Sequence, residues 1–194
     1  MKIKKLNEDS ILNERMSKII QRYAPPHGFI RTCHDSPTFE LVDNGIRYPI
    51  QVNVWAYEYE DDAAHPFVII HLTDPFDYYY YQYESWDIVK AVQGYLEDLA
   101  RYISRWTRKY FNKELNNMDT TVRARNKHTW KEVRIRIGGI DIASMTDNEI
   151  YEWTKSWLDL IFDEIHRYVT SNDKLYKIIC PKVMSLNPDD FKHI

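Results

Sequence analysis

The dipeptide Asn44-Gly45 constrains the fold most strongly, because it separates two runs of alternating apolar and polar residues. Asn-Gly favours a two-residue type I′ turn, whose central residues take positive φ angles. The turn fixes a register that pairs Asp43 with Ile46, Leu41 with Tyr48 and Phe39 with Ile50. One face of the resulting hairpin is apolar throughout: Phe39, Leu41, Tyr48, Ile50, Val52 and Val54. The sequence therefore predicts an antiparallel hairpin with one buried face.

The other face of this hairpin changes character along its second strand. It is polar at first, with Glu40, Arg47, Gln51 and Asn53, and then becomes aromatic, with Trp55, Tyr57 and Tyr59. Pro49 cannot donate to a strand ladder, so an edge position or a bulge is expected near it. After a loop, residues 67–73 are predicted to form a third antiparallel strand.

Three segments have the apolar spacing of helices. They are residues 9–23, which end at Pro25-Pro26, residues 85–114, and a last helix from Thr146 to about Val169. Thr146 and Glu149 form a capping box at the start of that last helix. Residues 24–37 are predicted to be an irregular connection, and residues 120–137 a second hairpin.

These elements predict an α+β fold with antiparallel strands in the order α-βββ-α-ββ-α, and with the helices packed on one face. We expect one domain over residues 1–170, with a two-lobed split near residues 116–117 as the alternative. Residues 171–194 are expected to form an extended tail or arm. Whether the two hairpins share one sheet stays open.

The aromatic residues form the first candidate site. Consecutive side chains of a strand point to opposite faces, so a run of four tyrosines cannot all enter one core. Tyr and Trp are also enriched at protein interfaces. We therefore expect a protein contact at Trp55, Tyr57, Tyr59, Tyr78, Tyr79, Tyr80, Tyr81 and Tyr83. The alternatives are burial under the long helix, or stacking on bases.

The second hairpin forms the other candidate site. Arg can grip phosphates through two hydrogen bonds, and an aromatic ring can stack on a base. Contact with nucleic acid or phosphate would use Arg123, Arg125, Lys127, Trp130, Arg134 and Arg136. The alternative is a solvated strand face, or one paired with acids such as Glu58 and Glu60. The arginines of the long helix are interpreted as helix-stabilising charges.

Catalytic and metal-binding patterns are weak. The sequence has no GxGxxG, P-loop, GxSxG or HExxH motif. His27, Cys33, His34 and Asp35 do not match a closed zinc spacing. The element order resembles nuclease cores with a (D/E)xK segment, but Glu132-Val133-Arg134 has Arg in the place of Lys. An enzyme of unrecognised class would use His71, Asp74 and the acids of residues 58–62. We expect no cofactor and no metal.

Composition limits the class of protein. The net charge is −3, so nucleic-acid binding would require a local basic patch. Two cysteines without a CxxC spacing and the lack of a long apolar run predict a cytoplasmic chain with no membrane segment. We expect a non-enzymatic interaction or assembly subunit, with a protein partner or as a homo-oligomer. A nucleic-acid-binding module is the second hypothesis, and an enzyme is the third.

Overall fold

The computed structural model describes residues 11–12, 14–34, 37–56, 67–73, 86–111, 119–124, 131–136 and 142–171. Residues 11–12 and 14–20 are helical, which we call the N-terminal helix. The further elements are β1 (Phe29–Cys33), β2 (Thr38–Asp43), β3 (Ile46–Ala56), β4 (Phe67–Thr73), α3 (Trp86–Phe111), β5 (Asp119–Ala124), β6 (Lys131–Arg136), the 3-10 helix η2 (Ile142–Ser144) and α4 (Asp147–Thr170).

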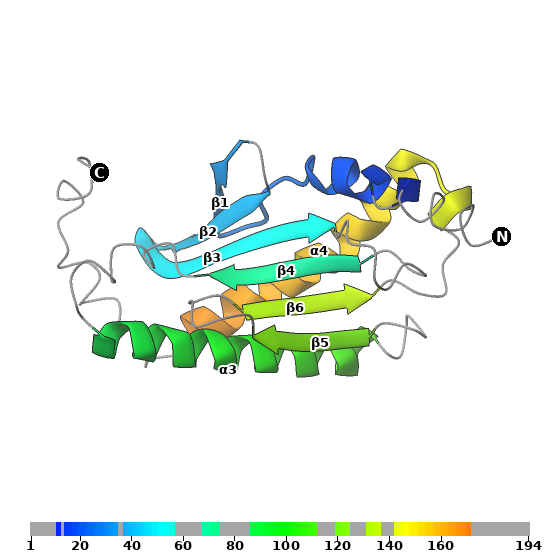
Figure 1. Cartoon of the computed structure of the whole chain (residues 1–194). Coiled ribbons are helices and arrows are strands. Elements are labelled where there is room, and N and C mark those ends of the chain that lie inside the picture. The colour runs from blue at the N-terminus through cyan, green and yellow to red at the C-terminus, as the bar shows by residue number, and fades with distance from the viewer. Residues whose placement is uncertain are drawn as a thin grey trace.

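All six strands form one antiparallel sheet in the order β1-β2-β3-β4-β6-β5 (Figure 1). The predicted α+β class is confirmed, and the two hairpins share a sheet because β4 pairs with β6. β1 corrects the prediction that residues 24–37 are irregular. Its sequence does not alternate apolar and polar residues, but pairing with β2 and burial of Phe29 hold it in an extended conformation.

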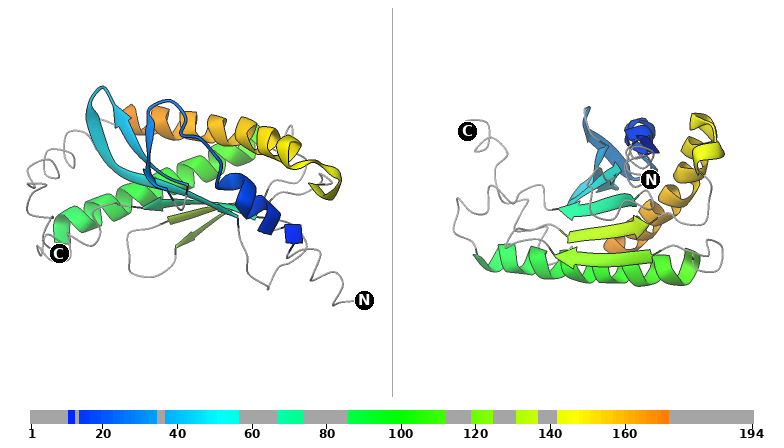
Figure 2. Two further views of the ribbon diagram at one scale, coloured as in Figure 1. Left: turned by 90° about the horizontal axis from the view of Figure 1, so that it is seen from above. Right: turned by 45° about the vertical axis from the view of Figure 1, so that its right-hand side comes forward.

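Helices α3 and α4 cover one face of this sheet, and Figure 2 shows both on the same side. The apolar residues of the first hairpin face them, as predicted. Phe39, Leu41, Ile50, Val52 and Val54 are all wholly buried. They belong to one core with Leu96, Leu99 and Ile103 of α3 and with Ile161, Phe162 and Ile165 of α4. No helix among the described residues is long and apolar enough to cross a membrane.

The turn between β2 and β3 has the predicted geometry, since φ is 50° at Asn44 and 76° at Gly45. Its first pairs are Asp43 with Ile46 and Val42 with Arg47. The predicted pairing of Phe39 with Ile50 is wrong, because Phe39 pairs with Val52. While β2 passes from Val42 to Glu40, β3 passes from Arg47 to Gln51, so β3 holds two extra residues. Pro49 lies within this bulge, where its missing N–H is tolerated.

An aromatic cluster joins α4 to three other segments. The ring of Phe162 lies 5.6 Å from Tyr23, 4.8 Å from Phe29 and 5.4 Å from Phe39, measured between centroids. These partners come from the segment that follows the N-terminal helix, from β1 and from β2. The predicted capping box is also present, with the Thr146 side chain accepting from the Glu149 N–H. Local capping and this cluster together fix where α4 begins and how it lies on the sheet.

Candidate interaction surface on the outer face of the sheet

The face of the sheet opposite α3 and α4, here called the outer face, carries the residues that alternate with the core. On β3 these are Gln51, Asn53 and Trp55, and on β4 they are Ile69, His71 and Thr73. The ladder pairs Gln51 with Thr73, Asn53 with His71 and Trp55 with Ile69. Directly opposite residues of an antiparallel pair share a face, so these side chains form rows across the sheet.

A chain of hydrogen bonds links three strands on this face. The Thr38 hydroxyl on β2 donates to Asn53 Oδ1, and Asn53 Nδ2 donates to Thr73 Oγ1 at 3.3 Å. The Thr73 hydroxyl in turn donates to Gln51 Oε1 at 3.3 Å. Thr38 is almost fully buried, which makes the bond to Asn53 necessary for its hydroxyl. The network gives the outer face a fixed polar framework.

Trp55 lies beside this framework and is 48% exposed. Its ring centroid lies 6.0 Å from that of His71, with the rings tilted by 33°. Ile69, opposite Trp55 in the ladder, is only 2% exposed. Ile30 on β1 is a second large apolar residue with 48% exposure, and it pairs with Glu40 on β2. The outer face thus combines an ordered polar centre with exposed apolar side chains.

The buried Glu40 carboxylate on this face is paired with Arg47. Glu40 is 3% exposed, and its Oε2 accepts a hydrogen bond from Arg47 Nε at 2.5 Å. Arg47 itself is exposed. The pair neutralises a buried carboxylate that would otherwise be costly to desolvate. A charge on this face therefore already has a partner within the chain.

The register of β6 with β4 and of β5 with β6 extends the outer-face rows across the second hairpin. Arg134 pairs with Ile69 of β4, in the row of Trp55, so the register places one residue of each predicted candidate site in the same row. Arg123 pairs with Glu132, and Arg136 pairs with Asp119. Opposite charges at directly opposite positions stabilise a ladder. The backbone thus gives two of the predicted phosphate-binding arginines acidic neighbours inside the hairpin.

The remaining predicted site residues lie outside the described part of the chain. They are Tyr57, Tyr59, Tyr78, Tyr79, Tyr80, Tyr81, Tyr83, Arg125, Lys127 and Trp130. The acids of residues 58–62 and Asp74 also lie there, so the predicted interface beyond Trp55 stays a prediction. Of the enzyme hypothesis, only His71 is described, and it lies beside Trp55.

The groups with shifted pKa values lie on the helix side of the molecule. Burial raises the pKa of Glu164, but hydrogen bonds from Arg167 and Tyr102 lower it more, so the net pKa is below its usual value. Burial and a 2.5 Å hydrogen bond to Asp159 raise the pKa of Tyr23. Glu164 joins α4 to α3, and Asp159 joins α4 to Tyr23. Both arrangements serve helix packing rather than an accessible site.

Two histidines and an aspartate lie near one another at the end of the first hairpin. The His27 and His166 rings are 6.4 Å apart, and His166 Nε2 lies 3.4 Å from Asp43 Oδ1. Neither these residues nor Cys33 and His34 belong to a group that could hold a metal, because the described residues contain no suitable cluster of three or more His, Cys, Asp or Glu. Asp35, the fourth residue of the weak sequence pattern, lies outside the described part.

Comparison of the chain with models of protein families, with curated proteins and with solved structures finds no significant match. The assignment of function therefore rests on the surfaces of this chain alone. Two parts of the outer face were missed by sequence reasoning. Ile30 lies in a segment predicted to be irregular, and the Thr38–Asn53–Thr73 network depends on strand pairing. The available sequence signal was the alternation of polar residues, at positions 38 and 40 and at positions 71 and 73, which indicates a polar strand face.

Proposed function

We propose that this chain is a non-enzymatic assembly subunit that binds another protein chain through the outer face of its sheet. The observation that carries the proposal is the half-exposed Trp55 on the third of six strands, next to an ordered hydrogen-bond network. Trp is the residue type most often found at the energetic centre of interfaces, where surrounding polar groups exclude water. A fixed framework lowers the entropy cost of binding.

A second copy of the chain is the partner to test first. The ladder alternates charges of both signs, with Arg123 across from Glu132 and Arg136 across from Asp119. A surface that carries both signs of charge beside exposed apolar side chains is able to match itself about a twofold axis. Because the register pairs two of the hairpin arginines with acids, nucleic-acid binding by the hairpin stays a secondary prediction.

The test is the solution mass of the full chain by light scattering after size exclusion, over a range of concentrations. We expect a defined multimer that Trp55→Ala weakens by about 30-fold, the effect of an interface residue worth about 2 kcal/mol. Leu160→Ala is the matched control, since Leu160 is 38% exposed but lies on α4. The double variant Tyr79→Ala and Tyr81→Ala tests the predicted tyrosines. A strict monomer excludes the second copy as partner, and unchanged association of the Trp55 variant contradicts the proposed surface.

A further inference from the structure

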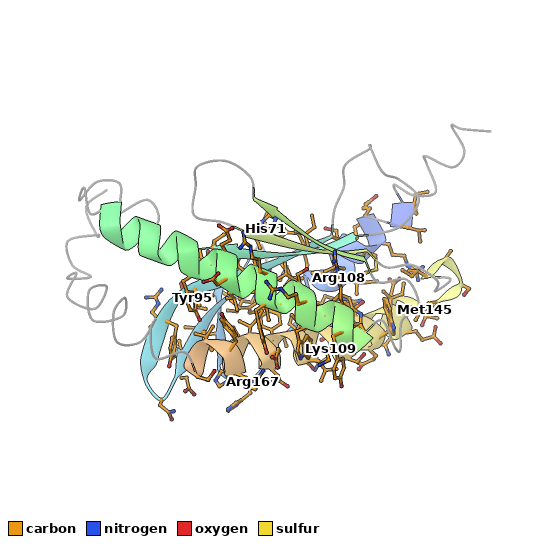
Figure 3. All side chains as sticks on the ribbon, turned by 90° about the horizontal axis from the view of Figure 1, so that it is seen from below. His71, Tyr95, Arg108, Lys109, Met145 and Arg167 are labelled. Atoms are coloured by element: carbon orange, nitrogen blue, oxygen red, sulfur yellow. The ribbon has the colours of Figure 1, made fainter. Side chains whose placement is uncertain are left out.

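The C-terminal half of α3 carries a concentration of positive charge. Residues 99–111 contain four Lys or Arg and no acid, in a chain whose net charge is −3. All four cations, Arg101, Arg105, Arg108 and Lys109, are exposed. Arg101, Arg105 and Lys109 follow one another at four-residue spacing, so they form one stripe with steps of about 6 Å along the helix. Figure 3 shows α3 in front of the other elements, with Arg108 and Lys109 towards its C-terminal end.

Local helix stabilisation accounts for only part of this stripe. Cations near a helix C-terminus are favoured only within the last turn, which here contains Arg108 and Lys109. Arg101 forms an ion pair with Glu97. The side chains of Arg105 and Lys109 form no ion pair or hydrogen bond within the part of the chain that the structure describes. Two cations of the stripe are therefore available to an external anion.

An ordered aromatic pair borders the stripe. Trp106 and Tyr110 are stacked, with centroids 4.9 Å apart and planes within 12° of each other. The Tyr110 ring also meets the buried Phe111 edge-on at 5.1 Å. Tyr110 remains 43% exposed. A ring that is already held in place can stack on an incoming planar group with little further loss of freedom.

The contrast with the β5–β6 hairpin identifies the stronger polyanion surface. In the hairpin, acids lie directly opposite Arg123 and Arg136. On α3, the cations extend over about two turns without an acid among them. A membrane surface is a poor fit, because the apolar face of a lipid-binding helix must enter the lipid. The apolar residues of α3, Leu96, Leu99 and Ile103, are wholly buried in the core.

We propose that the exposed side of α3 binds single-stranded nucleic acid, with Arg105 and Lys109 on the phosphates and Tyr110 stacked on a base. Cations in a row beside an aromatic platform are the general arrangement of single-strand binding. A duplex offers the phosphates but no unstacked base, which favours the single strand. This surface lies on the helix side, so it does not depend on the proposed contact through the outer face.

The test is fluorescence anisotropy of a short fluorescein-labelled oligothymidine with the full chain at increasing salt. With two phosphate contacts, from Arg105 and Lys109, the slope of log K against log salt is expected near −1.4, about −0.7 per contact. Arg105→Ala should weaken binding several-fold and reduce the magnitude of the slope by about 0.7. Arg123→Ala is the matched control and should change both quantities much less. Circular dichroism verifies that both variants are folded.

The aromatic component has its own pair of variants. Tyr110→Phe keeps the ring and should bind as the original chain does. Tyr110→Ala should weaken binding at least about five-fold, because base stacking is lost. Trp55→Ala should leave oligonucleotide binding unchanged. The proposal is overturned by absence of binding at low salt, by a flat salt dependence, by equal effects of Arg105→Ala and Arg123→Ala, or by equal binding to anionic vesicles or to a duplex.

Discussion

The two faces of the sheet differ in what fixes their residues, and neighbouring positions on β3 show it best. Val52 and Val54 are wholly buried beneath the helices, whereas Trp55 is 48% exposed on the outer face. On the covered face, burial of apolar surface accounts for the choice of Val52 and Val54. On the outer face, burial does not explain an exposed Trp. Because Trp is enriched at the centres of interfaces, this exposed ring is the candidate contact of the outer face.

The largest expected loss comes from the covered face. Phe162→Ala removes a wholly buried ring that contacts Tyr23, Phe29 and Phe39. We expect a decrease of about 3–5 kcal/mol in the free energy of unfolding, measured by urea denaturation. Leu160→Ala, on the exposed side of the same helix, should cost less than about 1 kcal/mol. Similar losses for the two variants would contradict the assignment of the core.

Glu164 tests the polar packing between the helices on the covered side. Its pKa is lowered in the folded state, so the carboxylate contributes stability above its unfolded pKa of about 4.3, and this contribution is lost as the pH falls towards the lower folded value. Glu164→Gln should cost about 1–3 kcal/mol at neutral pH and flatten the acid side of the stability profile. Urea melts at several pH values measure this. Glu152→Gln on the same helix is the control. If Glu164→Gln leaves the pH dependence of stability unchanged, Arg167 and Tyr102 do not stabilise the Glu164 carboxylate.

Asn53 tests whether the outer face has a structural framework of its own. Asn53→Ala removes hydrogen bonds to Thr38 and Thr73 on two neighbouring strands. The expected cost is about 1 kcal/mol, together with faster amide hydrogen exchange in β2 and β4. The exposed Asn148 on α4 supplies the control, and Asn148→Ala should leave exchange in the sheet unchanged.

Trp55→Ala gives the smallest expected change in stability. Together with Val54→Ala it compares the two faces of the sheet at neighbouring positions. Trp55→Ala should cost less than about 1 kcal/mol, the range of cross-strand contacts. Val54→Ala, one position away on the covered face, should cost more, about 1.5 kcal/mol. Association, measured by light scattering, should respond in the opposite order. If Trp55→Ala is the more destabilising change, the ring belongs to the fold and not to a contact surface.

Local signals in the sequence predicted the parts of the fold that local physics decides. The Asn44-Gly45 turn and the Thr146–Glu149 capping box are set by neighbouring residues, and both were predicted. β1 was missed, because its conformation depends on pairing with β2 and on the contact of Phe29 with Phe162. Strand order was also out of reach, since β4 and β6 are far apart in the sequence.

Local sequence likewise predicted some features of the candidate surfaces and missed those that depend on strand register. Trp55 was identified from the alternation of β3, which needs only local sequence. The acids opposite Arg123 and Arg136 were not identified, because the segment between β5 and β6 has no turn signal as strong as Asn-Gly to set the register. The stripe on α3 was visible as a cluster of cations, but only the structure separates paired Arg101 from Arg105 and Lys109.

The bulge around Pro49 determines which changes of length the β2–β3 hairpin can accept. Two extra residues on β3 keep the facing of every later side chain, so Val52 and Val54 still point to the helices. A deletion of one residue between Arg47 and Gln51 would turn Val52 and Val54 outward and Asn53 and Trp55 into the core. A deletion of two residues would restore the alternation and leave an ordinary ladder. Variants of this strand that lack two residues should therefore fold, whereas variants that lack one residue should not.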